Sequence, residues 1–301
     1  MKPFYTIMFF ISLTLFAVSV IALAFYGLNF GVDFEGGSVM EVEFEGTRPA
    51  IHELEVYLAE KFPDMEMSLN PSGDKGIIMR TTELSEEKHQ EILTILKAQV
   101  GDSKLEEKRF DSVGPAVGKE LREKSYVAIG IMLAAIAGYM TFVFRKLSRT
   151  LSLLAMNIST LVALLHDIVI PMGIFAVLGH YYNVQISAVF VAAVLTILGY
   201  TVSDKVVIFD RVRENILRGV GGTKGAKENL GHIVHKSVMQ TLVRSINNTL
   251  TVILSSAAIY LFGGESIRYF ALALILGVFL GAYSSIFVAS PLLVWMNKKI
   301  H

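Results

Sequence analysis

The chain has 301 residues, of which 53% are hydrophobic and 18% are charged. Soluble domains average about 25% charged and 45–50% apolar residues, so the composition favours a membrane protein. The formal net charge is zero and cysteine is absent. These properties exclude a generally basic nucleic-acid-binding protein, a disulfide framework and zinc sites with cysteine ligands.

The zero net charge is the sum of two parts of opposite sign. Residues 29–124 carry 21 acidic and 12 basic side chains, whereas the rest of the chain carries 6 acidic and 15 basic ones. We therefore expect three regions: a first transmembrane helix (1–28), an acidic domain (29–124), and a membrane region (125–301) with a loop near 210–240.

Six apolar runs are long enough to cross the hydrocarbon, which takes roughly 20 helical residues for about 30 Å. They cover residues 4–28, 126–144, 151–178, 184–209, 242–262 and 270–296. The first also resembles a signal peptide, because Lys2 precedes it and Ala22-Leu23-Ala24 resembles a cleavage site. The apolar run continues beyond these alanines and five further spans follow, so we interpret it as a transmembrane helix.

Lysine and arginine residues in short loops indicate the orientation, because such residues concentrate on the cytoplasmic side. The two short outer loops, 179–183 and 263–269, contain only Arg268. The other side receives Lys2, Arg145, Lys146, Arg149, Arg211, Arg213, Arg218, Lys224, Lys227, Lys236, Lys298 and Lys299. We therefore expect six spans with both termini in the cytoplasm and residues 29–124 outside it.

The acidic domain shows the periodicity of a small α+β fold. Met40, Val42 and Phe44 alternate with glutamates, as in a half-buried strand. Patterns typical of strands cover residues 40–45, 65–69, 76–81 and 104–113. Apolar residues at helical spacing predict helices at 49–62 and 85–96. The order β-α-β-β-α-β predicts a ferredoxin-like domain. The fold class is thus an α-helical polytopic membrane protein with a small extracytoplasmic ferredoxin-like domain.

Asp204 and Arg244 are candidate functional residues, since ionisable groups inside a membrane span are costly unless paired or hydrated. If the fourth span ends near Asp210, Asp204 lies about 9 Å inside it. If the fifth begins near Gln240, Arg244 lies about 6 Å inside, at a similar depth on an antiparallel helix. We expect an ion-coupling pair, with a purely structural salt bridge as the alternative.

His166 and Asp167 lie about 24 Å from the cytoplasmic start of the third span, one turn before Pro171. They are either a hydrogen-bonded pair that stabilises a proline kink or an outer station on an ion path to Asp204. Lys205, next to Asp204, is expected to extend toward the cytoplasmic interface, since long charged side chains can reach polar surroundings.

The motif GVDFEGG follows the first span and contains Gly31, Asp33, Gly36 and Gly37. Its glycines predict a tight turn before the first strand, because glycine tolerates positive φ, and Asp33 is expected to cap this turn. The alternative is that this junction between membrane and domain transmits motion.

Small residues predict close helix contacts in the second and last spans. They are Gly130, Ala134, Ala137, Gly138, Gly277 and Gly281. The basic, glycine-interrupted segment 219–236 is expected to lie on the anionic membrane surface. The sequence contains no GxSxG, HExxH or Walker A motif, so we expect no enzymatic activity, cofactor or metal site.

Several segments together resemble the SecD/SecF family of protein-export membrane subunits. They are GVDFEGG at 31–37, SVGPAVGKEL at 112–121, LLHDI at 164–168, GYTVSDKVVIFDRVREN at 199–215 and QTLVRSINNTL at 240–250. The resemblance covers nearly the whole chain, in order. It implies an RND-type protein of a bacterial or archaeal plasma membrane, whose six spans form a heterodimer with SecD.

The resemblance also implies a function. Family members work beside the SecYEG channel, with YajC, and use the proton motive force or a sodium gradient to help draw unfolded preproteins out. Asp204 matches the family's intramembrane acid, and Arg244 matches the arginine of the fifth-span motif. Lys205 departs from the small polar residue that usually follows this acid, which leaves the coupling ion, proton or sodium, open.

Two other functions fit the sequence. The chain could be a half-size RND-type exporter of lipids or small molecules that works as a homodimer. It could also be a passive scaffold in which the ion pair only holds helices together. Copurification with SecD and SecYEG would favour the translocase over the exporter.

Overall fold

The computed structural model describes residues 3–46, 48–100, 105–145, 151–218 and 230–297. The chain divides into two compact units. One comprises Met1–Asn29 and Val127–His301, and the other comprises Phe30–Tyr126. The second unit thus begins one residue and ends two residues after the expected limits, 29 and 124.

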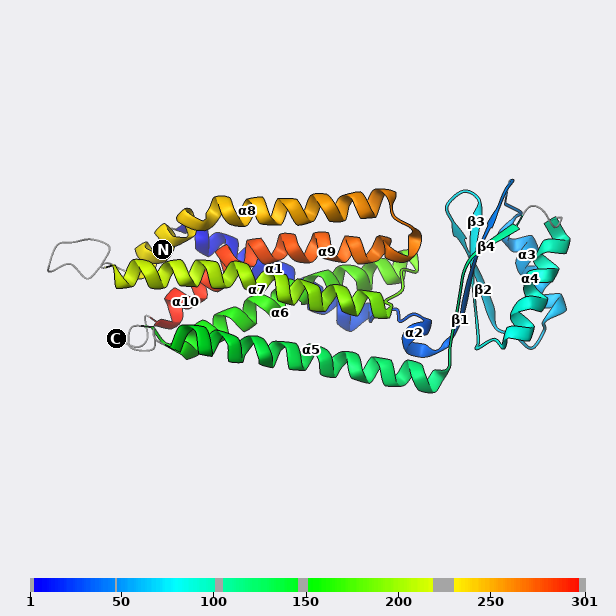
Figure 1. Cartoon of the computed structure of the whole chain (residues 1–301), viewed down its shortest axis with the longest axis horizontal. Helices are drawn as coiled ribbons and strands as arrows, with labels where there is room; N and C mark the ends of the chain where they lie inside the picture. Colours follow the sequence, from blue (N-terminus) through cyan, green and yellow to red (C-terminus); the bar gives the residue numbers. More distant parts are fainter. Residues whose placement is uncertain (1–2, 47, 101–104, 146–150, 219–229, 298–301) are drawn as a thin grey trace. The chain divides into compact units, whose positions relative to one another are not determined.

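Within the described residues, six helical segments are long and apolar enough to cross a membrane (Figure 1). Five are single helices: α1 (Pro3–Tyr26), α5 (Pro115–Phe144), α6 (Leu153–Tyr182), α7 (Ala188–Leu217) and α8 (Leu230–Phe262). The sixth consists of α9 (Glu265–Ser284), a π-helical turn (Ser285–Ala289) and α10 (Ser290–Asn297). The predicted multi-pass helical membrane protein is confirmed.

Several helices extend beyond the apolar runs that predict them. Helix α7 continues to Leu217 and α8 begins at Leu230, so much of the predicted loop 210–240 is helical. Hydropathy locates only the apolar part of a helix, and charged residues extend it without interrupting the backbone hydrogen bonds. Of the predicted surface segment 219–236, residues 219–229 lie outside the described part of the chain.

Helices α6, α7 and α9 pack against one another, α1 packs on α6, and α8 packs on α7 and α9. Gly277 and Gly281 allow α9 to approach α7 closely. A β-carbon at Gly277 would lie 2.3 Å from Ile197 Cδ1, and one at Gly281 would lie 2.0 Å from Thr201 Cγ2. The predicted close contact of the last span is therefore confirmed.

The small residues of α5 have different surroundings. A β-carbon at Gly130 or Gly138 would meet nothing within 4 Å in the described structure, and Ala134 is exposed. Helix α5 instead packs through larger side chains: Ile136, Met140 and Phe144 are buried, and the Phe144 ring meets that of Phe209 at 6.4 Å. The predicted helix contact is not present at Gly130 or Gly138 within the described part of the chain.

The second unit contains a four-stranded sheet with the order β2-β3-β1-β4, in which all neighbours are antiparallel. Its strands are β1 (Gly37–Phe44), β2 (Met67–Ser72), β3 (Gly76–Thr81) and β4 (Leu105–Val113). Its helices are α2 (Val32–Glu35), α3 (Ile51–Lys61) and α4 (Glu86–Val100). This order confirms the predicted ferredoxin-like domain.

The core of this domain lies between the sheet and helices α3 and α4, which cover one face (Figure 1). Alternate residues of β1 and β3 point into it, as the period of a strand requires. The core includes Met40, Val42, Phe44, Ile77 and Met79 from the strands and Leu54, Leu58, Ile92 and Leu96 from the helices.

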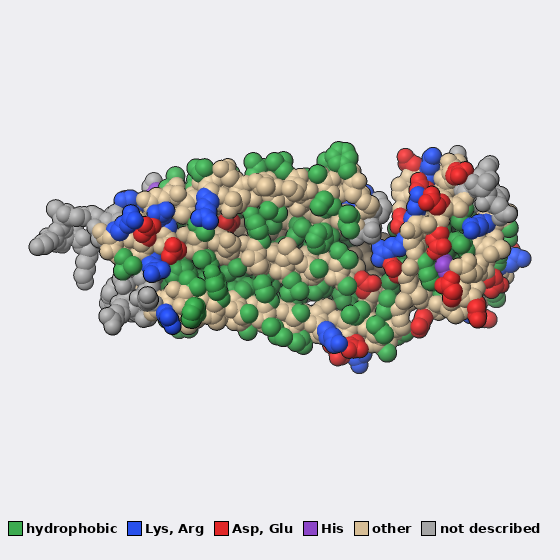
Figure 2. Space-filling model, viewed as in Figure 1, with side chains coloured by type: hydrophobic (Ala, Val, Ile, Leu, Met, Phe, Trp, Pro, Cys, Tyr) green, Lys and Arg blue, Asp and Glu red, His purple; other side chains and the backbone are tan. Residues whose placement is uncertain are grey.

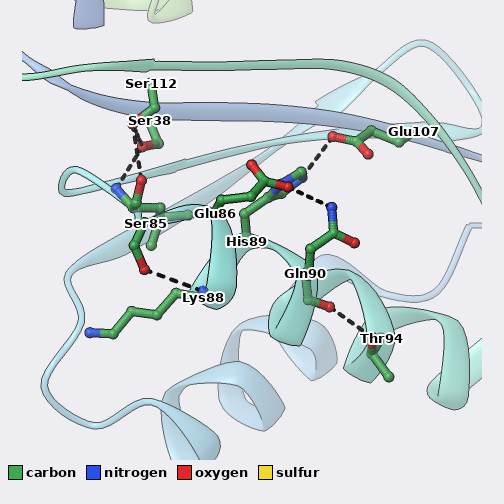
Figure 3. Close-up of polar contacts among 10 residues, drawn as sticks. Ser38, Ser85, Glu86, Lys88, His89, Gln90, Thr94, Glu107 and Ser112 are labelled. Carbon is green, nitrogen blue, oxygen red and sulfur yellow. Dashed lines mark hydrogen bonds and ion pairs between the residues drawn. The ribbon is translucent and has the colours of Figure 1, made fainter.

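Polar contacts also hold α4 against the edge strand β4 (Figure 3). The His89 ring stacks on Phe110 with centroids 3.7 Å apart, its Nε2 lies 2.8 Å from Glu107 Oε1, and its Nδ1 lies 3.2 Å from Glu86 Oε1. A hydrogen bond from Gln90, and to a smaller extent one from His89, lowers the pKa of the Glu86 carboxyl. This polar cluster therefore joins α4 to β4.

The glycines of α9 give a test of the α7–α9 contact. Gly281→Ala forces a β-carbon into Thr201, and overpacking of this kind costs about 1–3 kcal/mol. We expect the variant to lower the Tm of the detergent-solubilised chain by several degrees in a thermal unfolding scan. The control is Gly138→Ala, which meets open space and should leave the Tm equal or higher, because alanine favours helix over glycine. Equal effects of both substitutions would contradict the contact.

Candidate functional site

A cluster of ionisable side chains lies inside the helical bundle. Helix α6 supplies His166 and Asp167, and α7 supplies Asp204 and Lys205, all at most 6% exposed. Asp167 is about 21 Å from the Leu153 end of α6, and Asp204 is about 20 Å from the Leu217 end of α7. Both carboxylates therefore lie near the middle of their helices.

Lys205 forms a buried salt bridge with Asp167. Its Nζ donates to Asp167 Oδ2 at 2.7 Å and to the Thr201 carbonyl at 3.3 Å, and both charged side chains are fully buried. The expectation that Lys205 extends to the interface is wrong. Helix α7 runs about 18 Å beyond Lys205, while a carboxylate on the neighbouring helix lies within direct reach.

The same contact corrects the predicted depth of Asp204 relative to Asp167. Asp167 was expected far from Asp204 along the membrane normal, but it binds the residue next to Asp204. The difference arises because α7 continues to Leu217, which places Asp204 deeper in the bundle than an end near Asp210 implies.

His166 connects this salt bridge to α1 and α9. Its Nε2 lies 2.6 Å from Ser12 Oγ, and its Nδ1 lies 3.3 Å from Asp167 Oδ1. The Tyr283 ring stacks near the imidazole at 6.4 Å, and its hydroxyl donates to the Met8 carbonyl at 2.7 Å. His166 and Asp167 thus form the predicted hydrogen-bonded pair, and α6 continues as a helix through Pro171.

Asp204 has a neutral partner. Its Oδ2 accepts a hydrogen bond from Ser245 Oγ at 3.0 Å. Among the described residues, no ion pair joins Asp204 to Arg244, which is exposed on α8. The prediction identified the correct pair of helices, but the α8 residue that contacts Asp204 directly is Ser245, the neighbour of Arg244; adjacent helical residues point about 100° apart.

Sequence reasoning missed Ser245, although α8 carries a signal for it. Small hydroxyl residues recur at every fourth position and are all buried: Ser237, Thr241, Ser245 and Thr249. This spacing places them on one face of the helix. A buried row of hydroxyl residues on the helix next to that of Asp204 would have indicated Ser245 as the partner of this acid.

The two carboxylates of the cluster have different surroundings. The charge of Asp167 is balanced by Lys205, whereas Asp204 receives only a hydroxyl hydrogen bond within the described structure. Among the described residues Asp204 forms no salt bridge, and a buried carboxylate of this kind is the group whose charge a proton or a cation can change. Asp204 is therefore the candidate ion-coupling residue of this chain.

The GVDFEGG motif makes a tight turn that begins β1. Gly36 and Gly37 have φ of +84° and +112°, as predicted for glycine in a turn. A β-carbon at Gly36 would lie 2.7 Å from Pro115 Cα, and one at Gly37 would lie 2.6 Å from the Thr81 carbonyl oxygen. Gly36 therefore allows the turn to pack on the first residue of α5, and Gly37 allows it to pack on the end of β3.

The other two motif residues predicted to matter, Gly31 and Asp33, lie at the start of helix α2. Gly31 precedes α2 as its N-cap with an extended backbone, and its carbonyl accepts hydrogen bonds from the Phe34 and Glu35 amides. Asp33 lies in the first turn of α2, and its role as the cap of the glycine turn stays a prediction.

The fold and the site together define a polytopic membrane protein with ionisable residues in the core of its bundle. Residues 93–299 match the family described as protein export membrane protein SecD/SecF, C-terminal, and residues 21–47 match the SecD/SecF GG motif. The chain belongs to the SecD/SecF family, which confirms the resemblance seen in its motifs.

Individual relatives agree with this assignment. The chain is 41% identical to the protein translocase subunit SecF of Thermobaculum terrenum, over 96% of this chain and 91% of the relative. It is 34% identical to the protein translocase subunit SecF of Anaerolinea thermophila, over 97% of this chain and 92% of the relative.

Solved SecDF structures share the fold. A crystal structure of SecDF from Thermus, described as a translocon-associated membrane protein, matches with a TM-score of 0.77 and 30% identity over 98% of this chain. SecDF in its super-membrane-facing form matches with a TM-score of 0.66 and 28% identity over 98% of this chain. This chain spans only 39% and 38% of those two chains.

The salt bridge between Asp167 and Lys205 predicts a pattern of stabilities. Lys205→Met leaves a buried carboxylate without its charge partner, which costs about 3–5 kcal/mol, whereas Asp167→Asn/Lys205→Met removes both charges and should be closer to wild type. Thermal unfolding of the solubilised chain measures this order. Lys236→Met, at an exposed lysine of α8, is the control and should not change the Tm. A double variant no more stable than Lys205→Met would contradict the pairing.

Proposed function

We propose that this chain is the SecF-type accessory subunit of the Sec protein translocase and that, with SecD, it couples ion flow to late steps of preprotein export. The observation that carries this proposal is Asp204, a carboxylate in the middle of the bundle whose direct partner is the neutral Ser245. The family membership supplies protein export as the work to which such a site would be coupled.

The proposed mechanism begins when an ion passes the His166 and Asp167 region and neutralises Asp204. The Ser245 hydroxyl can donate to the carboxylate or accept from the protonated acid, so the contact between α7 and α8 changes character without leaving a polar group unpaired. Arg244 directly precedes Ser245 on α8 and therefore moves with this helix. The rearranged helices then reposition the outer domain, which holds or releases the emerging chain.

Basic residues support the proposed orientation in a bacterial or archaeal plasma membrane. Figure 2 shows lysine and arginine gathered at one end of the helical bundle, while hydrophobic side chains cover its length. Arg145 at the end of α5 and Arg211 and Arg213 near the end of α7 contribute to this end. On the positive-inside rule, we propose that this end and both termini face the cytoplasm and that Phe30–Tyr126 lies outside it.

Helix α8 supports a membrane-embedded partner. Its exposed surface contains a stripe of polar residues: Gln240, Arg244, Asn247, Asn248, Thr251 and Ser255. Beside it lies an exposed apolar face made of Met239, Val243, Ile246, Leu250 and Leu254. The apolar face suits lipid, but amides and a guanidinium facing hydrocarbon are costly. A second protein surface is therefore expected to cover the stripe.

We propose that SecD is this partner, in a heterodimer. The solved SecDF chains are more than twice as long as the part that matches this chain, which leaves room for a SecD portion. SecYEG, YajC and the unfolded preprotein complete the proposed assembly. A half-size exporter would instead cover the stripe with a second copy of this chain.

The coupling role of Asp204 can be tested in membrane vesicles that contain SecYEG, SecD and this chain and export a preprotein with SecA and ATP. Asp204→Asn keeps the shape of the side chain and removes its titration. We expect the gradient-dependent part of export to fall to the level seen without a gradient, while ATP-driven export remains. Proton and sodium gradients applied separately identify the ion.

Asp210→Asn is the matched control, because Asp210 is an exposed acid on the same helix, paired with Arg213. This variant should keep the stimulation by the gradient. Unchanged stimulation in Asp204→Asn would refute the coupling role and favour the passive scaffold.

Crosslinking can test the partner of α8, because the natural chain has no cysteine and each introduced thiol is unique. Asn247→Cys lies on the polar stripe, and Leu254→Cys lies on the apolar face, where Leu254 is 61% exposed. We expect a thiol-reactive crosslinker to join Asn247→Cys to SecD in membranes and to leave Leu254→Cys uncrosslinked. Crosslinks to a second copy alone would favour the exporter.

A further inference from the structure

The Lys205 ammonium lies among oxygen atoms of the kind that bind hard metal cations. Asp167 Oδ2 is 2.7 Å and the Thr201 carbonyl oxygen 3.3 Å from Nζ. Thr201 Oγ1 is buried without a hydrogen-bond partner in the described structure. Carboxylate, carbonyl and hydroxyl oxygens are the donors that hard cations prefer.

Two neighbouring features close this position. The missing β-carbon of Gly281 would lie 3.6 Å from Asp167 Oδ2, so α9 packs directly on the carboxylate. Pro171 has no amide hydrogen and cannot donate to the Asp167 carbonyl four residues earlier, which leaves another oxygen of this residue without its helical donor. The position is therefore closed to bulk solvent, lined by oxygen atoms and occupied by an ammonium group.

We propose that Lys205 is a built-in cation that excludes sodium from Asp167 and thereby determines the ion specificity of the bundle core. An ammonium is a compact charge with three donors. It supplies the positive charge that a fully buried carboxylate requires, and it fills the space in which a sodium ion would contact the same oxygens.

The consequence for transport rests on the proposed function. If ions cross this chain, Asp204 is the carboxylate left for them, and its direct partner is a single hydroxyl. Hard metal cations take several oxygen ligands, and the ammonium keeps the Asp167 oxygens from contributing to such a set, whereas a proton needs only the Asp204 carboxylate and its hydroxyl partner. The coupling ion of this chain is then the proton.

The experiment measures cation binding and needs no transport. The full chain in lipid nanodiscs is unfolded thermally in sodium chloride and in choline chloride of equal ionic strength. We expect the wild-type Tm to be the same in both salts. Lys205→Ser removes the ammonium and opens its space, so sodium should raise its Tm saturably, by about 5 °C near a hundredfold excess over the dissociation constant.

Two further variants locate the effect. Lys205→Ser/Asp167→Asn removes the carboxylate and should lose the response to sodium. Lys205→Met removes the charge but fills the space and should not respond. Folding of Lys205→Ser in sodium but not in choline supports the proposal equally well.

Three results would overturn the proposal. One is a wild-type Tm that rises in sodium while the Tm of the Asp167→Asn variant does not. Another is a folded Lys205→Ser variant that does not respond to sodium. The third is a Lys205→Ser variant that folds in neither salt while Lys205→Ser/Asp167→Asn folds in both. Loss of gradient-driven export in Asp204→Asn is a separate result, so the proposed function and this inference can fail independently.

Discussion

The bundle depends on the pairing of two charges that hydrocarbon cannot solvate. Asp167 and Lys205 are fully buried and joined at 2.7 Å, so α6 and α7 must remain in one register or expose an unpaired charge. The neighbouring contacts follow from this register. Ser12 reaches His166 from α1, and the absence of a β-carbon at Gly281 brings α9 onto Thr201. One salt bridge thus relates four of the membrane helices.

The sequence predicts the elements of this fold because their patterns depend on local physical chemistry. Alternation in Met40, Val42 and Phe44 identifies a strand from its period alone, and long apolar runs identify spans from their length. The ends of α7 and α8 could not be predicted in the same way, because residues 210–217 and 230–240 are polar enough to resemble a loop. The end of a helix determines the depth of its residues, so the error at the end of α7 displaced Asp204.

The rotation of each helix is the part of the site that the sequence predicts least well. Ser245 and Arg244 are adjacent, yet one meets Asp204 and the other is exposed; only packing against α7 decides between them. The glycines show the same limit. Gly281 and Gly138 look alike in a list of small residues, but one lies against a neighbouring helix and the other meets open space. Spacing identifies a face, and tertiary contacts decide what that face meets.

The difference between the two carboxylates suits a coupling device better than two equivalent acids would. A bundle whose only buried acid changed its charge would lose its register each time, whereas in the proposed mechanism Asp167 keeps its lysine while Asp204 changes its charge. Ser245 faces inward and Arg244 outward from the same turn of α8, so a rotation that adjusts the first contact necessarily moves the second. A change at Asp204 therefore has a mechanical route to the polar stripe, and through it to whichever subunit covers that surface.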